Sequence, residues 1–343
     1  MTDHPGDAET MYMLGILHGQ RNELAKSENY MKRAIAAGLP EGRLIAGPRE
    51  MLKPLANSEL IKALSTKYDH EPVHGPLVGN VTDSTASFWV RTGKVSKVTV
   101  QITDPASGKK VGLSDDVQSR SSEDFTAVVN ASSLEPNHEY QYSILIDGQP
   151  SQKKYSFRTL PRKAEASKFV IAFGGGAGYV PENERMWNTI GEFDPQAILL
   201  LGDNVYIDDP ESVIMQQYTY QRRQSRPEWR KLTARSPVFT IWDDHETAND
   251  SWFGGAENHQ SDVEGDWGAR RDAALQAYYE WMPIREPALR RDVDLGTSDT
   301  PLTQGFRSFD LADLVSLHVL ETRLTARDEQ LAYPDEDAVA ARI

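Results

Sequence analysis

Acidic side chains, an imidazole and a phenol follow two apolar runs that lie about forty residues apart in the chain. Apolar runs of this kind are typical of buried parallel strands, whose carboxyl ends meet at one edge of a sheet. Three carboxylates and an imidazole brought to one edge would form a two-metal hydrolase site. In chain order, the polar residues at the two strand ends are Asp203, Asn204, Tyr206, Asp243, Asp244 and His245.

Several of these residues have a predicted part in such a site. Gly202 lets the backbone turn sharply, and this turn places Asp203 where it can bridge two cations. Tyr206 would offer a phenolate to a hard ferric ion, and Asp243 would add an oxygen ligand. Oxygen-rich ligand sets favour hard ions such as Ca²⁺, Mg²⁺, Mn²⁺ or Fe³⁺. Two ions about 3.5–4 Å apart can hold a phosphoryl group, generate hydroxide and stabilise an in-line displacement.

Two further features could contact a phosphate. The amide groups of the glycine run 174–176 could face it, and the alternative is a tight turn from strand to helix. The segment 218–230 is the one basic cluster of an acidic sequence, and its arginines could bind phosphate with two hydrogen bonds each. The alternative for this segment is a solvated helix face. The residues that we assign to the substrate are Gly176, Asn204, Arg222 and Arg223.

Three segments differ in their hydrophobic period. Residues 1–71 repeat apolar positions every three to four residues, which predicts a helical leader resembling one tetratricopeptide-like hairpin. The leader could bind a partner protein, although helices packed on the neighbouring domain are the simpler interpretation. Residues 72–162 contain short strands separated by turn signals, which are typical of an antiparallel β-sandwich. Residues 163–343 alternate strands and helices, which predicts an α/β domain with a parallel sheet.

The positions of individual elements follow from the same patterns. The strands that we expect are 86–91, 97–102, 125–129, 140–146, 155–159, 169–173, 197–201, 237–242 and 314–320. The helices that we expect in the α/β part are 184–190, 211–234 and 266–281.

Composition limits the classes of function. The 343 residues carry a net charge of −14, which argues against non-specific binding to nucleic acid or to anionic membranes. A small phosphate ester remains compatible, because bound cations can invert the local field. The sequence has no cysteine, so disulfides, thiolate nucleophiles and zinc–thiolate sites are excluded. No apolar run is long enough to span a membrane, and no export signal stands at Met1. As written, the chain is expected in the cytoplasm, and an upstream export signal would place it in the periplasm or outside the cell.

Three motifs in this order resemble those of the PhoD-like alkaline phosphatases of the calcineurin-like metallophosphoesterase superfamily. They are Phe173–Tyr179, Leu201–Tyr206 and Trp242–Glu246. The segment before them is similar to the N-terminal β domain of that family, and residues 134–142 look like the corner of a fibronectin type III domain. The resemblance implies a multi-domain fold with a helical leader, a fibronectin III-like sandwich and a layered α/β metallophosphoesterase domain.

The resemblance also implies an activity and residue roles. The activity is hydrolysis of small phosphoric esters, mono- or diesters, with Ca²⁺ and Fe³⁺ as metals and Mn²⁺, Mg²⁺ or Zn²⁺ as alternatives. Asp203 matches the aspartate that bridges the metals, and Tyr206 matches a tyrosine that ligates iron. Asp244 matches a ligand of the second metal. His245 matches the histidine that contacts the phosphoryl oxygen or protonates the leaving group.

The sequence departs from the family pattern at three places. Gly176 stands where the family has a metal-binding cysteine, and Glu321 replaces an aspartate. The family pattern continues with a strand that ends in Gly-Asp-x-His, and no such motif follows Arg323. We therefore expect a catalytic domain whose C-terminal part is missing. This leaves a second hypothesis open beside the hydrolase, in which the chain is an inactive remnant that acts as an interaction module.

Overall fold

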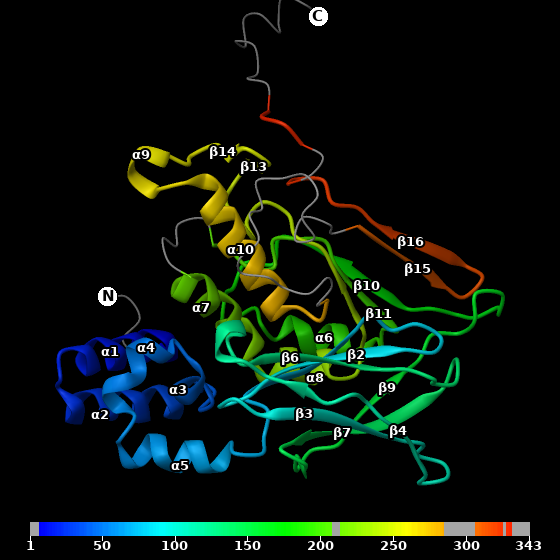
Figure 1. Cartoon of the computed structure of the whole chain (residues 1–343), viewed down its shortest axis with the longest axis horizontal. Coiled ribbons are helices and arrows are strands. Elements are labelled where there is room, and N and C mark those ends of the chain that lie inside the picture. The colour runs from blue at the N-terminus through cyan, green and yellow to red at the C-terminus, as the bar shows by residue number, and fades with distance from the viewer. Residues whose placement is uncertain (1–6, 208–212, 285–305, 325–326, 331–343) are drawn as a thin grey trace, which may run out of the picture.

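The structure is a computed structural model of the chain and describes residues 7–207, 213–284, 306–324 and 327–330. Its described part contains two large β-sheets with helices on the outside (Figure 1). No helix in these ranges is both long and apolar enough to cross a lipid bilayer. The predicted helix 211–234 begins, and the segment 163–343 ends, in residues outside the described ranges.

The first sheet continues from the α/β part of the chain into the β-sandwich. Its central strand β12 pairs in parallel with β11 on one side and with β1 on the other. Strands β2 and β6 then continue the sheet in antiparallel orientation. The predicted parallel sheet and the predicted sandwich therefore share one mixed sheet. In spatial order its strands are β10 (Ile171–Gly174), β11 (Ala197–Leu200), β12 (Val238–Thr240), β1 (His74–Gly79), β2 (Ala86–Arg91) and β6 (Thr126–Ala131).

The second sheet is antiparallel and covers one face of the first. Side chains of β2 alternate between the two faces, as strand geometry requires. Phe88 and Val90 belong to the core between the two sheets, whereas Trp89 lies in the core under the helices. The strands of the second sheet are β3 (Lys97–Thr103), β4 (Lys110–Leu113), β5 (Val117–Gln118), β7 (Glu139–Ile146), β8 (Gln149–Pro150) and β9 (Tyr155–Arg158).

Helices cover the other face of the first sheet. Trp89 of β2 is fully buried there and donates its Nε1 hydrogen bond to the carbonyl of Glu280 over 2.7 Å. A parallel sheet needs other elements packed on both of its faces, because its strands carry apolar side chains on both. These helices are α6 (Met186–Glu192), α7 (Val213–Gln224), α8 (Pro227–Thr233) and α10 (Trp267–Trp281). The short helix α9 (Ser261–Glu264) precedes α10, buries no residue and lies away from the sheet (Figure 1).

Two predicted elements differ from the structure. The stretch predicted as one helix over 211–234 is broken between α7 and α8, because the residue before a proline is disfavoured in helical geometry. Arg226, which precedes Pro227, accordingly has an extended ψ of 130°. The predicted strand 314–320 is present as β16 (Val315–Val319), but it pairs with β15 (Arg307–Leu311) in a separate antiparallel hairpin. The two short strands β13 (Ser251–Trp252) and β14 (Gly255–Ala256) form a second such hairpin.

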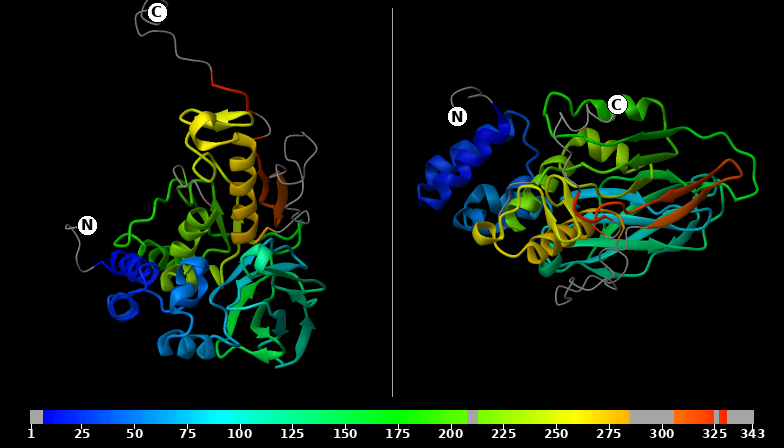
Figure 2. Two further views of the ribbon diagram at one scale, coloured as in Figure 1. Left: turned by 60° about the vertical axis from the view of Figure 1, so that its left-hand side comes forward. Right: turned by 90° about the horizontal axis from the view of Figure 1, so that it is seen from above.

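The helical leader packs beside one end of the sheets and against α7 (Figure 1 and Figure 2). The fully buried guanidinium of Arg43 forms an ion pair with Glu9 at 2.8 Å. Tyr218 of α7 donates a hydrogen bond to the same carboxylate over 2.7 Å. The hydrogen bond from Tyr218 thus joins α7 to an ion pair inside the leader. The leader consists of α1 (Ala8–Gln20), α2 (Leu24–Ala36), α3 (Arg43–Ala46), α4 (Arg49–Leu52) and α5 (Glu59–Lys67).

We predict that Arg43→Met lowers the free energy of unfolding by about 3 kcal/mol, because removing one partner leaves the other charge buried and unpaired. Denaturant unfolding followed by circular dichroism measures this change. The control is Lys62→Met, which removes an exposed ion pair with Glu59 and should cost less than about 0.5 kcal/mol. Equal effects of the two substitutions would contradict the structural role of Arg43.

Candidate metal centre

The candidate site lies where β11 and β12 end side by side. The two strands run in parallel register up to the pair Leu200↔Thr240, so the loops that follow start from neighbouring points. Gly202 in the first loop has φ +99°, and a Cβ atom there would lie 2.4 Å from the Cβ of Asp243 in the second. Because a side chain fits neither this backbone conformation nor this approach, the predicted sharp turn at Gly202 is confirmed.

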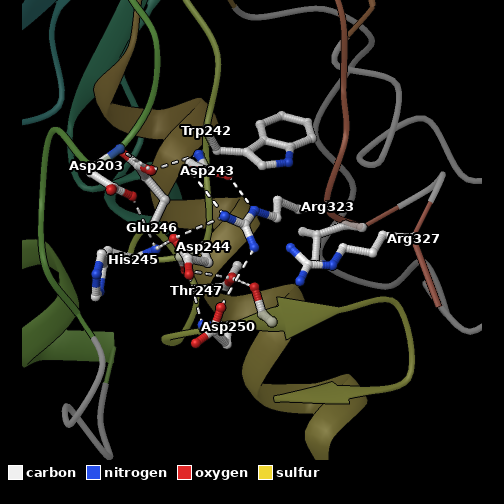
Figure 3. Close-up of polar contacts among 12 residues, drawn as sticks. Asp203, Trp242, Asp243, Asp244, His245, Glu246, Thr247, Asp250, Arg323 and Arg327 are labelled. Atoms are coloured by element: carbon white, nitrogen blue, oxygen red, sulfur yellow. Dashed lines mark hydrogen bonds and ion pairs between the residues drawn. The ribbon is translucent and has the colours of Figure 1, made fainter. Parts of the chain in front are cut away.

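The carboxylate of Glu246 ties the two loops together (Figure 3). It accepts hydrogen bonds from the backbone N–H groups of Asp203 over 2.8 Å, Asn204 over 2.7 Å and Asp243 over 2.9 Å. Glu246 is 1% exposed. Its removal from water raises its pKa to about 7, although the three amide donors act in the opposite direction. This buried side chain therefore sets the relative position of the two loops.

The role of Glu246 was not predicted from the sequence. One signal was present, since Glu246 follows Asp243 by three residues and accepts its N–H, as the glutamate of a capping box does for the first residue. The bonds to the loop that contains Asp203 join segments far apart in the chain. No local pattern reports them.

Asp203, Asp244 and His245 form the centre of the site (Figure 3). Each offers one ligand atom, and these atoms lie within 4.8 Å of one another. Burial, and then the neighbouring carboxylate of Asp244, raise the pKa of Asp203. Burial also acts to raise the pKa of Asp244, but the N–H of Asp250 and the guanidinium of Arg323 outweigh it and lower that pKa.

This donor set fits a metal ion. The carboxylate of Asp244 raises the proton affinity of Asp203, and a cation bound between them would relieve this repulsion. Two carboxylate oxygens and one imidazole nitrogen suit Mn²⁺, Fe³⁺ or Zn²⁺, and the oxygens alone suit Ca²⁺ or Mg²⁺. The structure thus brings together three of the residues that the sequence predicts for the site.

Asp243 lies beside this group but is engaged elsewhere. Its two carboxylate oxygens accept hydrogen bonds from Nε and Nη2 of Arg323, the latter over 3.1 Å. The planar guanidinium matches a carboxylate in this two-bond geometry. In the structure Asp243 is an ion-pair partner of Arg323, and its role as a metal ligand stays a prediction.

Tyr206 and Gly176 reach the site from two loops. The Tyr206 ring lies against the imidazole of His245, with 4.2 Å between the ring centroids. Gly176 has φ +68°, and a Cβ atom there would lie 3.9 Å from the Tyr206 hydroxyl. The N–H of Gly176 donates to the carbonyl of Gly202 over 3.2 Å. The glycine run thus borders the site as predicted, but this amide supports the neighbouring loop instead of facing a phosphate.

Two other residues that the sequence predicts to contact phosphate, Arg223 and Asn204, are buried. Arg223 is 3% exposed, pairs with Glu184 at 3.0 Å and donates to the Asn204 carbonyl over 3.0 Å. Asn204 is itself buried. The predicted substrate role of these two side chains is corrected to support of the loop that carries Asp203. The guanidinium of Arg222 lies over the ring of Tyr179, 4.5 Å from its centroid.

We predict that Glu246→Gln loosens the site as a whole. An amide has one acceptor oxygen, and its NH₂ group would face backbone donors, so the free energy of unfolding should fall by about 2 kcal/mol. Metal affinity should fall about 10- to 100-fold, as it does when groups that orient metal ligands are changed. Denaturant unfolding and calorimetric titration with Mn²⁺ test both effects. The exposed Glu257 provides the control, because Glu257→Gln should change neither quantity.

Comparisons with known proteins match both the sandwich and the α/β part of the chain. A model of the PhoD-like phosphatase family matches residues 171–342, and a domain of unknown function, DUF7800, matches residues 69–163. Alkaline phosphatase D of Bacillus subtilis (strain 168) is 29% identical over 221 residues, with 59% of this chain and 36% of that protein covered. A solved structure of PhoD is 25% identical and superposes with a TM-score of 0.63, covering 75% of this chain and 52% of the solved one.

The chain thus spans about half or less of the length of these two relatives. The structural match supports a fold that combines several sheets with helices. Since the family model matches half of the sequence, this chain belongs to the PhoD-like phosphatase family.

Proposed function

We propose that the protein is a metal-dependent hydrolase of small phosphoric esters. The observation that carries the proposal is the group Asp203, Asp244 and His245, whose ligand atoms lie within 4.8 Å of one another at the ends of two parallel strands. Membership of the PhoD-like phosphatase family and the similarity to an alkaline phosphatase D support the same activity. Both phosphomonoesters and phosphodiesters are candidate substrates.

In this proposal the two carboxylates hold the metal. Asp203 and Asp244 contribute one oxygen each. The backbone N–H groups that donate to Glu246 keep the two loops together, and the Asp250 N–H donates to Asp244 within the second loop. When bound, metal ions would polarise a phosphoryl oxygen and make water a stronger nucleophile at neutral pH. Ca²⁺ and Fe³⁺ remain the ions proposed from the family resemblance. Of the two ions in that proposal, the carboxylates of Asp203 and Asp244 provide for one.

His245 is proposed to move a proton. The His245 ring lies between the carboxylates of Asp203 and Asp244 on one side and the ring of Tyr206 on the other. A proton donor at this place could serve the leaving oxygen of a bound ester, because the oxygen becomes basic as its bond to phosphorus breaks. Tyr206 is 37% exposed and can contact both a bound ester and an iron ion in the proposed complex.

The leader is proposed as the surface for a partner protein. Most of its apolar side chains are buried among themselves and against Tyr218 of α7, whereas Leu17 and Leu24 are exposed. A partner would therefore meet the charged outer faces of α2 and α5, where Lys32 and Lys62 are exposed.

We predict that Asp203→Asn reduces hydrolysis of p-nitrophenyl phosphate and of bis(p-nitrophenyl) phosphate at least about 100-fold, because a charged metal ligand is lost. Chelation of metals in the wild-type protein should have the same effect, and added Mn²⁺ should reverse it. The control is Asp262→Asn on the exposed helix α9, which should keep full activity. Turnover that survives both Asp203→Asn and chelation would reject the proposal. Absence of turnover in the wild-type protein with metal would favour the interaction-module hypothesis.

A separate prediction concerns His245. If His245 protonates the leaving oxygen, His245→Gln should lower kcat about 100- to 10,000-fold for an alkyl phosphate. The loss should be much smaller for p-nitrophenyl phosphate, because p-nitrophenolate leaves without a proton. Metal content, measured on the same samples, should be unchanged. Loss of metal together with activity would show that His245 is a ligand instead.

A further inference from the structure

Arg323 occupies a pocket made of three carboxylates. Besides its two bonds to Asp243, its Nη2 lies 3.7 Å from Oδ1 of Asp244 and its Nη1 lies 3.9 Å from Oδ1 of Asp250. Figure 3 shows the guanidinium among these carboxylates, with His245 on the far side of Asp244. Asp244 therefore stands between two positions for a positive charge. One is the Asp203–Asp244–His245 group, and the other is filled by Arg323.

The position of Arg323 is built into the fold. The buried carboxylate of Glu321 accepts a hydrogen bond from Trp242 Nε1 over 2.8 Å. The same oxygen accepts the backbone N–H groups of Arg323 over 2.8 Å and of Leu324 over 2.7 Å. Because Trp242 immediately precedes Asp243, this carboxylate fixes the Arg323 backbone next to the loop whose acids Arg323 neutralises. The glutamate that departs from the family pattern thus has a structural part here.

Charge balance decides what the pocket can accept. Four aspartate carboxylates meet in this region, from Asp203, Asp243, Asp244 and Asp250, beside the Glu246 carboxylate, whose oxygens accept backbone N–H groups. Together, Arg323 and one divalent ion neutralise most of their charge, whereas a second metal ion would have to share Asp243 with a guanidinium that cannot lose its proton. A metal ion bound to Asp243 would lie close to the Arg323 guanidinium, and two positive charges so close together repel strongly in a partly buried site. The pocket of Arg323 is therefore closed to a metal as long as the arginine stays.

We propose that Arg323 is the second, permanent cation of this site, so that the chain binds one metal ion and not two. The proposal rests on the proposed function for the existence of the metal, and it changes the two-metal arrangement expected from the sequence. In this arrangement the Asp244 carboxylate lies next to both the metal ion and Arg323. Of these two cations, Asp243 and Asp250 neutralise only Arg323. Arg323 acts as a positioning residue, since it orients the loop of Asp243 and Asp244 without being assigned a contact to substrate.

The test counts metal ions on the full chain. Metal-free protein is equilibrated with Mn²⁺ and dialysed, and bound metal is measured by mass spectrometry and by calorimetric titration. We expect one ion for the wild-type protein, for Arg323→Lys and for the control Arg327→Met, whose arginine lies nearby but pairs with Gln330. Arg323→Met opens the three-carboxylate pocket and should bind a second ion. The additional substitution Asp243→Asn should remove that second ion again.

The outcomes separate this inference from the proposed function. Two ions on the wild-type protein would overturn the role of Arg323 and leave the hydrolase proposal standing. No ion on the wild-type protein would overturn both. One ion on a folded Arg323→Met variant would also overturn the inference.

A thermal measurement covers the case of an unstable variant. Without metal, Arg323→Met should melt at a lower temperature than wild type, because three carboxylates lose their cation. Mn²⁺ should then raise its Tm by more than it raises that of the wild type. Equal shifts in the two proteins would count against the second site. The wild-type metal count needs no variant and decides the proposal even if Arg323→Met does not fold.

Discussion

Strand β12 pairs on both of its sides, and the site depends on both pairings. Its pairing with β11 puts the loop of Gly202 against the loop of Asp243, and its pairing with β1 joins these loops to the sandwich. Val238 takes part in both pairings and is fully buried. The sandwich therefore supplies part of the sheet from which the site loops emerge. Moving β1 would disturb the register that brings the acids together.

The electrostatics of the site follow from the hydrogen-bond donors and cations that offset the negative charge of each carboxylate. Glu246 is compensated by three backbone amides, and Asp243 by a guanidinium with two hydrogen bonds. Asp244 receives a backbone N–H and lies near the same arginine. Asp203 receives the least, and burial together with its neighbour raises its pKa. The least compensated carboxylate is the one at which a metal ion gains most, so the protein's own charge pattern favours the proposed position of the ion.

What the sequence predicts well is what local patterns report. The apolar runs before Asp203 and Asp243 indicate buried strands, and strand ends at one edge of a sheet bring their polar residues together. The helix predicted over 266–281 agrees closely with α10 because its polar N-terminus and apolar period are local signals. The break at Pro227 was also a local signal, and the sequence contained the information needed to predict it.

What the sequence did not predict depends on partners that are distant in the chain. An arginine in a basic stretch looks the same whether it meets solvent or a buried glutamate, so the burial of Arg223 against Glu184 could not be foreseen. The pairing of Asp243 with Arg323 joins residues 80 positions apart. Hydrophobic periodicity reports which residues are buried, but it does not report which charges meet inside.

Contacts through α7 connect the leader with the site. On this one helix, Tyr218 bonds to Glu9 of the leader, and Arg223 bonds to the Asn204 carbonyl next to Asp203. Arg223 cannot move away cheaply, because its buried partner Glu184 would be left without a counter-charge. The last turn of α7 is therefore held by the buried Arg223–Glu184 pair, and Tyr218 near the middle of the helix is held by its hydrogen bond to Glu9. Through these two contacts on one helix, the leader supports the loop of Asp203.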